Sequence, residues 1–134
     1  MQLEKITDSN FTNVADAWFE KYQDGLIILK FEASWCGPCK VMTKSLADLS
    51  DDYFDNDVKI CSVDIDSADD LSRIFNIRSV PTMVFLSKFQ YEKILDENPS
   101  TLTMEIAYVF GSVPMEDIKK VIKEVKDNLW KQTS

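Results

Sequence analysis

The feature that most constrains the fold of this chain is an apolar run that leads into two closely spaced cysteines and then into a helix. Residues 26–33 open with Leu-Ile-Ile-Leu, which predicts a strand buried on both faces, as in a parallel sheet. Cys36 and Cys39 follow at once. After Pro38, apolar residues recur with the helical period as far as Leu49. Strand, cysteine pair and helix are therefore contiguous.

The remaining chain alternates between the two periodicities, which predicts a βαβα arrangement of the α/β class. Further helices are predicted over residues 8–22 and 114–129. A short helix is also predicted after Asp66 and Ser67, which would cap its start. The further predicted strands are residues 58–65, 82–86 and 106–110. No repeat or linker divides the chain, so we expect a single domain over 1–134.

Composition and charge exclude several classes of function. The 134 residues, 45% apolar and 11% aromatic, suffice for the core of one domain. A net charge of -8 repels phosphate backbones and anionic lipids, which argues against nucleic-acid and membrane partners. Three cysteines without histidine are too few for a closed zinc site or a disulfide framework. Without an apolar leader at residues 1–10, we expect a cytoplasmic protein.

The cysteine pair has a clear chemical interpretation at the start of a helix. Unpaired N–H groups and the positive helix end favour the thiolate of Cys36, the form that attacks disulfides. Cys39, one turn further on, can then resolve the mixed disulfide. Gly37 lets a substrate backbone approach, and Pro38 fixes φ without losing a hydrogen bond. The alternative of half a zinc ribbon lacks its second half, because Cys61 stands alone.

With these residues in view, the chain resembles the thioredoxin family. The match covers the motif Trp-Cys-Gly-Pro-Cys-Lys at 35–40, and it extends to Asp24-Gly25, Phe31, Ala33, Asp66, Val80-Pro81-Thr82 and Gly111. The resemblance implies the thioredoxin fold, a central mixed five-stranded sheet flanked by four helices. It also implies a monomeric reductase of protein disulfides that binds no cofactor and receives electrons from an NADPH-dependent thioredoxin reductase, in electron transport and cell redox homeostasis.

The resemblance also implies a substrate surface around the dithiol. The Val80-Pro81 peptide would be cis and face the cysteines, with the backbone of Val80 pairing with the substrate chain. Trp35 would line this surface, together with Gly37, Pro38 and Gly111. The alternatives are that Trp35 is an ordinary core residue and that Pro81 is an ordinary proline at the start of an edge strand.

Two positions on the central strand depart from the family pattern. Lys30 stands where thioredoxins usually carry a buried aspartate, and Glu32 where many carry a tryptophan. Period 2 puts both side chains on one face, which predicts a buried Lys30-Glu32 pair beneath the dithiol. Lys30 would then be catalytic, either as an ammonium that stabilises the Cys39 thiolate or as a neutral proton acceptor. In the alternative, Lys30 extends to water and has no catalytic role.

Residues 87–105 interrupt the match, because most thioredoxins join these strands by a tight turn. We expect an insertion at the end of the domain opposite the active site, with either a docking or a passive role. Its apolar residues are expected to pack on the sheet as a short helix or hairpin, and they are Phe89, Tyr91, Ile94 and Leu95. Residues 96–101 predict a turn. Cys61, in an apolar strand, is expected to be a core thiol.

Two other functions remain open at this point. A disulfide oxidase or isomerase would use the same pair, but related oxidants typically place histidine between the cysteines. A redox-independent interaction subunit of a larger complex would use only the surface. The intact Cys36 and Cys39 weaken that second alternative.

Overall fold

The structure of the protein is a computed structural model that describes residues 3–52, 57–96 and 106–128. The strands in these ranges are β1 (Glu4–Ile6), β2 (Leu26–Glu32), β3 (Val58–Asp64), β4 (Thr82–Ser87) and β5 (Ala107–Phe110). The helices are α1 (Phe11–Lys21), α2 (Gly37–Asp52), α3 (Asp69–Ile74), α4 (Lys88–Asp96) and α5 (Met115–Asp127). None of these helices is long and apolar enough to cross a membrane.

The strands form one mixed sheet in the order β1-β3-β2-β4-β5. β3 runs parallel to β1 and β2, whereas β4 runs antiparallel to β2 and β5. β2 lies at the centre, and all its residues except Glu32 are buried. This confirms the prediction of a strand covered on both faces.

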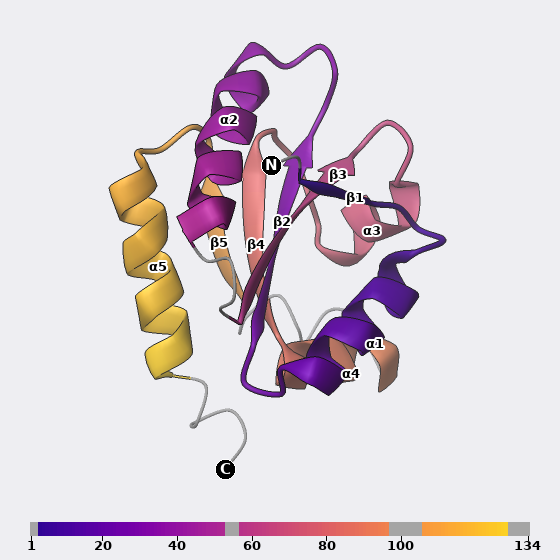
Figure 1. Ribbon diagram of the computed structural model, residues 1–134. Coiled ribbons are helices and arrows are strands. Elements are labelled where there is room, and N and C mark those ends of the chain that lie inside the picture. Colours follow the sequence, from indigo (N-terminus) through magenta and orange to yellow (C-terminus); the bar gives the residue numbers. More distant parts are fainter. Residues whose placement is uncertain (1–2, 53–56, 97–105, 129–134) are drawn as a thin grey trace.

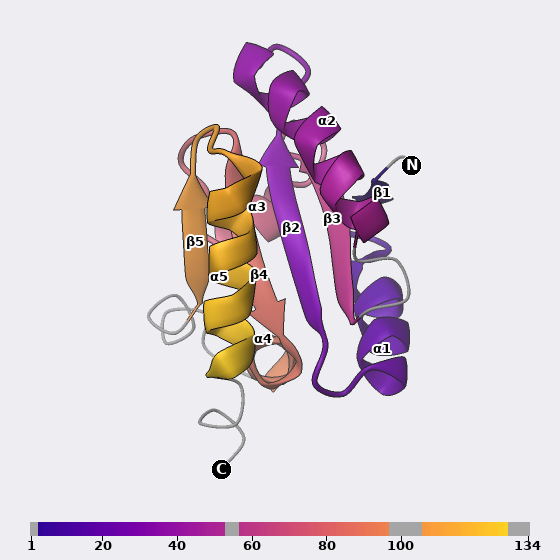
Figure 2. The ribbon, with the colours of Figure 1, turned by 60° about the vertical axis from the view of Figure 1, so that its left-hand side comes forward.

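Helices cover the two faces of the sheet, with α2 and α5 on one side and α1, α3 and α4 on the other (Figures 1 and 2). Alternate residues of β2 serve the two cores because side chains on a strand have period 2. Leu26 and Ile28 pack in the core with α2 and α5, while Ile27 and Leu29 pack in the other core. Lys30 continues the first series, so a charged side chain enters the space beneath α2.

The architecture agrees with the one that the resemblance implies, with two differences in its elements. The described ranges contain five helices instead of four, because α4 forms within residues 87–105. β1 was not predicted. It is three residues long and lies at the sheet edge, which is too short for a strand periodicity to stand out.

The cap of α3 differs from the prediction. Asp66 and Ser67 were expected to cap this helix, but the N-cap residue is Ala68, whose side chain cannot accept a hydrogen bond. The carboxylate of Asp8 instead accepts hydrogen bonds from the backbone N–H groups of Asp70 at 3.1 Å and Leu71 at 2.9 Å. These donors lack partners within the helix, and a distant loop supplies the acceptor that the local sequence does not.

Helix α4 lies at the end of the sheet opposite the start of α2, which is where the segment 87–105 was expected (Figure 1). Tyr91 and Ile94 pack into the core with α1. The expected packing of Leu95 in the core is wrong, since this side chain is 55% exposed. Apart from residue 96, which ends α4, the predicted turn over 96–101 falls outside the described residues.

Candidate active site

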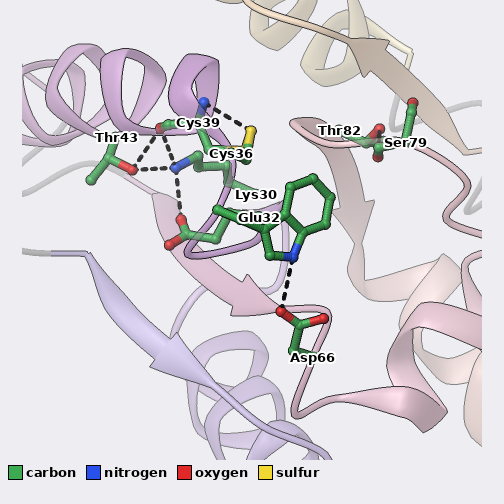
Figure 3. Close-up of a disulfide and its surroundings, with 9 residues drawn as sticks. Lys30, Glu32, Cys36, Cys39, Thr43, Asp66, Ser79 and Thr82 are labelled. Atoms are coloured by element: carbon green, nitrogen blue, oxygen red, sulfur yellow. Dashed lines mark hydrogen bonds and ion pairs between the residues drawn. A yellow bond between two sulfur atoms is a disulfide. The ribbon is translucent and has the colours of Figure 1, made fainter.

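Cys36 and Cys39 lie at the carboxyl end of β2, where the chain turns into α2 (Figure 3). The backbone N–H of Cys36 donates to the carbonyl of Ala33 at 3.1 Å, which closes the turn before the helix. The two cysteines form a disulfide, and their Cα atoms are 5.3 Å apart. The cysteines predicted to act together are therefore bonded to each other.

The sulfur of Cys36 faces the first turn of α2. It accepts a hydrogen bond from the backbone N–H of Cys39 at 3.1 Å. This N–H belongs to the first-turn donors that have no partner inside a helix. The first turn contains no acidic residue, so no carboxylate opposes the positive end of the helix dipole. After reduction of the disulfide, this donor and this dipole favour the thiolate of Cys36.

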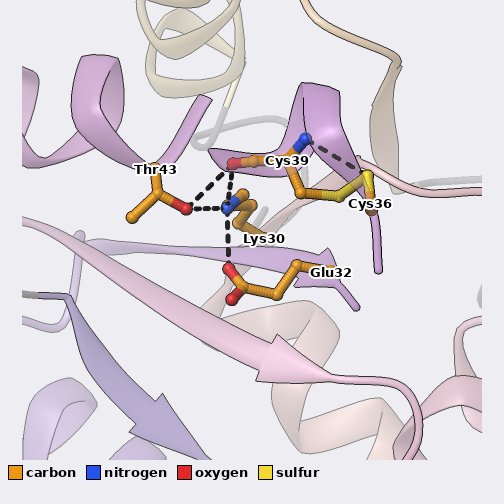
Figure 4. Close-up of polar contacts among 5 residues, drawn as sticks. All are labelled: Lys30, Glu32, Cys36, Cys39 and Thr43. Carbon is orange, nitrogen blue, oxygen red and sulfur yellow. Dashed lines mark hydrogen bonds and ion pairs between the residues drawn. A yellow bond between two sulfur atoms is a disulfide. The ribbon is translucent and has the colours of Figure 1, made fainter. Parts of the chain in front are cut away.

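Lys30 reaches from β2 to the underside of the same helical turn (Figure 4). Its Nζ donates to the carbonyl oxygen of Cys39 at 2.8 Å, to Oε1 of Glu32 at 2.7 Å and to the hydroxyl of Thr43. The Thr43 hydroxyl donates to the same carbonyl at 2.9 Å. The predicted contact between Lys30 and Glu32 is confirmed, but only Lys30 of the pair is fully buried, since the side chain of Glu32 is 28% exposed.

These contacts distinguish among the interpretations of Lys30. The side chain is 0% exposed, so it does not extend to water. Three acceptors surround Nζ, which matches the three donors of an ammonium. A neutral proton acceptor would need a donor directed at this nitrogen, whereas its hydrogen bonds to the described residues all run from Nζ to an acceptor. The atom of Cys39 that accepts a hydrogen bond from Lys30 is the backbone carbonyl oxygen, so this contact is with the backbone of α2.

Thr43 is a member of this site that the sequence interpretation missed. It lies four residues after Cys39 and therefore on the same face of α2. That spacing was the available signal. Its relevance emerges only when the helix is placed over Lys30 on β2.

Trp35 stands beside the dithiol and is 68% exposed, which excludes the core interpretation. Its indole Nε1–H donates to the carboxylate of Asp66 at 3.2 Å, in the loop after β3 (Figure 3). Pro38 is also exposed, and a Cβ added to Gly37 would meet no atom within 4 Å. The surface next to Cys36 is thus open to an approaching chain.

The start of β4 and the end of β5 complete the surroundings of the cysteines. Val80 packs against the small cluster that contains Cys36 and Cys39. The Val80-Pro81 peptide is cis, as the resemblance implies. The N–H of Gly111 donates to the carbonyl of Pro81 at 2.8 Å, and the φ of +80° at Gly111 lies in the region that favours glycine.

The third cysteine is separate from this site. Cys61 is fully buried in the core beneath α1, as expected. Burial raises its pKa to about 12, which keeps the thiol protonated and unreactive at neutral pH. Within the described residues, no group of histidine, cysteine and carboxylate side chains is suited to hold a metal ion.

Comparisons with known proteins agree with this geometry. The family model described as Thioredoxin matches residues 2–107. A thioredoxin of Staphylococcus saprophyticus is 32% identical over 124 residues, which are 92% of this chain and 98% of that protein. A thioredoxin of Staphylococcus haemolyticus is 33% identical over 107 residues, which are 79% of this chain and 95% of that protein.

Solved structures confirm the fold. The crystal structure of chloroplastic thioredoxin z matches with a TM-score of 0.67 and 25% identity, and the match covers 95% of this chain and 96% of that one. The germline-specific thioredoxin Deadhead of Drosophila melanogaster also gives a TM-score of 0.67, at 24% identity, covering 90% of this chain and 96% of that one. The sheet, the helix arrangement and the cysteine pair at the start of α2 lead to the same conclusion: the chain belongs to the thioredoxin family.

Proposed function

We propose that this chain reduces disulfide bonds in other proteins through Cys36 and Cys39. Thiol-disulfide oxidoreductase activity follows from the family and from a cysteine pair that forms a disulfide. One observation supports the assignment of roles above all others. The sulfur of Cys36 accepts the N–H of Cys39 at the opening of α2, where a negative sulfur is stabilised.

The reaction consists of two exchange steps. The Cys36 thiolate attacks one sulfur of a substrate disulfide, and the other substrate sulfur leaves as a thiolate. The thiolate of Cys39 then attacks Cys36 in the mixed disulfide and releases the second substrate sulfur. The substrate gains two electrons and two protons, and the chain is left with the Cys36–Cys39 disulfide.

The oxidised chain must recover two electrons before the next cycle. We infer that an NADPH-dependent thioredoxin reductase supplies them, in keeping with electron transport and redox homeostasis in a cytoplasm where thiols stay reduced. We further infer that the chain acts as a monomer. Its net charge of -8 favours protein partners over nucleic acid or anionic membranes.

The substrate surface proposed here surrounds the dithiol. Trp35, Gly37 and Pro38 provide the exposed rim beside Cys36, while Val80, Pro81 and Gly111 border it on the sheet side. The backbone of Val80 is the proposed partner for an extended substrate segment. Recognition through backbone groups suits a reductase with many substrates.

We assign Lys30 a positioning role. Its ammonium fixes the Cys39 carbonyl and brings positive charge beneath the first turn of α2. This charge favours thiolate formation above it, so a cation takes the place of the usual carboxylate. We also propose that residues 1–134 form one thioredoxin domain and that 87–105 are an insertion within it.

A single-turnover experiment tests the proposed roles without any reductase. The reduced full-length chain is mixed with a disulfide-containing protein, and the release of substrate thiols is followed. Wild type should release them, Cys36→Ser should release none, and Cys39→Ser should accumulate a mixed disulfide on Cys36. Cys61→Ala is the matched control and should react like wild type. Substrate reduction by Cys36→Ser at the wild-type rate would refute the proposal.

The same preparations separate the competing functions. A reduction potential well above that of cytosolic glutathione would assign the chain to the oxidases or isomerases. A Cys36→Ser, Cys39→Ser double variant that retains the biological role would assign it to interaction subunits. A reductase should show a low potential and lose its role in the double variant.

A further inference from the structure

A pocket of about 440 Å³ lies behind the dithiol, between α2 and the edge of the sheet formed by β1 and β3. Its volume falls within the range of about 300 to 1,000 Å³ that is typical of small-molecule sites. Glu32 and Thr43, which Figure 4 shows around the Lys30 ammonium, form part of its wall. The rest of the lining comes from the first strand region, from β3 and from α2, and consists of Leu3, Lys5, Ser62, Lys40, Lys44 and Ala47. The proposed protein substrate surface beside Trp35 does not include this pocket.

The charge of the pocket is opposite to that of the chain. Three exposed lysines line it, Lys5 from β1 and Lys40 and Lys44 from α2. None of their ammonium groups has a hydrogen bond or an ion pair to the described residues. Glu32 is the one carboxylate of the lining, and Lys30 neutralises it at 2.7 Å. A chain of net charge -8 thus gathers three unpaired positive charges around one pocket.

The placement of these lysines brings like charges together around the pocket. Lys40 and Lys44 are four residues apart on α2, and like charges at this spacing repel each other. Lys5 faces them from a different element. An anion bound between the two groups would relieve this repulsion, and a ligand with two anionic groups would contact β1 and α2 together.

A second observation, independent of charge, points to a ligand. Ser62 on β3 lines the same pocket, and its side chain is only 8% exposed. Its hydroxyl has no hydrogen-bond partner among the described residues. Ser62 is the register neighbour of both Lys5 and Lys30 in the sheet. Its Oγ atom is not fully buried and is accessible from the pocket, so it is free to donate a hydrogen bond to an oxygen of a bound ligand.

We propose that this pocket binds a compact polyanion with two linked phosphate or carboxylate groups. One anionic group contacts Lys40 and Lys44, and the other contacts Lys5 and the hydroxyl of Ser62. The ligand needs no redox chemistry, so this inference is independent of the proposed disulfide reduction. It is testable on the oxidised protein, in which the dithiol does not react.

Inorganic pyrophosphate is the probe for the binding test. It is titrated calorimetrically into the oxidised full-length chain at low, constant ionic strength, and one site per chain is expected. Lys44→Glu should weaken the binding by about tenfold, because it replaces an attraction by a repulsion. Ser62→Ala should weaken it by about threefold, the loss of one ordinary hydrogen bond.

The matched control is Lys123→Glu, which makes the same charge change at an exposed lysine of α5 outside the pocket. It should alter the affinity by less than about twofold, since separated surface charges are screened by salt. Equal weakening by Lys44→Glu and Lys123→Glu would overturn the proposal, because it would show a general charge effect. The absence of saturable pyrophosphate binding would overturn it as well.

Amide resonances locate the bound anion. Pyrophosphate should shift the backbone amide signals of Lys5, Thr43 and Ser62 with a common affinity. Shifts confined to other parts of the chain would contradict the site. A competition with citrate distinguishes the ligand sources: displacement of pyrophosphate from these residues extends the site to polycarboxylates, and persistence of the shifts restricts it to phosphates.

Discussion

Lys30 is a charged side chain with no exposed surface at the centre of the sheet. Burial of an ammonium costs several kcal/mol unless partners compensate for the lost water. Here the carboxylate of Glu32 supplies a charge, and the Cys39 carbonyl and the Thr43 hydroxyl supply two more acceptors. The same contacts tie the first turn of α2 to β2. The contacts that stabilise the buried ammonium therefore also hold the helical turn that contains Cys39.

Replacement of Lys30 by methionine tests this role at the level of one residue. Lys30→Met removes a positive charge from beneath the dithiol, so thiolates form there less readily. The profile of disulfide-reduction rate against pH should move to higher pH by roughly half a unit to one unit. Stopped-flow rates of substrate thiol release between pH 5 and pH 9 give this profile.

A double variant controls for the carboxylate that the first change leaves unpaired. Lys30→Met with Glu32→Gln removes both charges, and its profile should move in the same direction by a smaller amount. A purely structural role would lower stability without moving the profile. Coincidence of all three pH profiles would exclude Lys30 from the mechanism.

The sequence made part of this residue-level arrangement predictable. Period 2 on a strand put Lys30 and Glu32 on one face, and the salt bridge between them confirms it. Thr43 was missed because it belongs to another element. Its contact with Lys30 depends on how α2 crosses β2, which neither the spacing of apolar residues nor the cysteine motif specifies.

At the scale of elements, the hydroxyl of Tyr91 joins α4 to α1 in addition to apolar packing. The hydroxyl of Tyr91 donates to Oδ1 of Asp16 at 2.6 Å and approaches the carbonyl of Thr12 at 3.2 Å. The ring packs edge-on against Phe11 in the same core. α4 thus depends on Tyr91 for its attachment to the body of the domain.

Removal of this hydroxyl should weaken the attachment of α4 without affecting the chemistry. Tyr91→Phe should lower the free energy of unfolding by about 1 to 2 kcal/mol, because it removes a hydrogen bond to a charged acceptor. Urea denaturation measures the change. The rate of disulfide reduction should stay at the wild-type value, since α4 lies at the opposite end of the sheet from the cysteines.

Tyr22→Phe provides the control for that measurement. Tyr22 is also partly buried, but its hydroxyl has no hydrogen-bond partner among the described residues, so this change should cost less than about 0.5 kcal/mol. Equal losses for the two variants would show that the contact with Asp16 contributes nothing.

Elements with long periodic patterns were predictable, and those that depend on distant partners were not. The predicted segments 26–33 and 58–65 match β2 and β3 to within one residue at each end. Within residues 87–105, the apolar pattern left helix and hairpin open because it covers only residues 89–95. The contact of Tyr91 with α1, which holds the helix α4, is not visible in that pattern. The cap of α3 was mispredicted because Asp8, its acceptor, lies some sixty positions away.

At the scale of the whole molecule, the mixed five-stranded sheet was implied by the family resemblance, and the order of its strands was not predicted. Apolar patterns identify strands but do not say which strands are neighbours. The structure supplies the order β1-β3-β2-β4-β5. It also brings motif residues that are distant in sequence into contact, since Asp66 accepts a hydrogen bond from Trp35 and Gly111 donates one to Pro81.

The stability of the molecule at alkaline pH should depend on Cys61. Burial raises the pKa of this thiol from 9.0 to about 12, so above pH 9 the unfolded chain releases a proton that the folded chain retains. The free energy of unfolding of the oxidised protein should therefore fall from pH 9 upward, with a slope that approaches about 1.4 kcal/mol per pH unit for this group.

Tyr91 and Tyr108 also have raised pKa values, but their ordinary value of 10.0 places their effect at higher pH. The difference between wild type and Cys61→Ala in urea unfolding from pH 8 to pH 10 isolates the thiol, because both proteins contain the same tyrosines. Cys61→Ala should be less stable than wild type at pH 8 because it leaves a small cavity, and its stability should fall less between pH 9 and pH 10. Parallel pH profiles for the two proteins would contradict this origin of the alkaline instability.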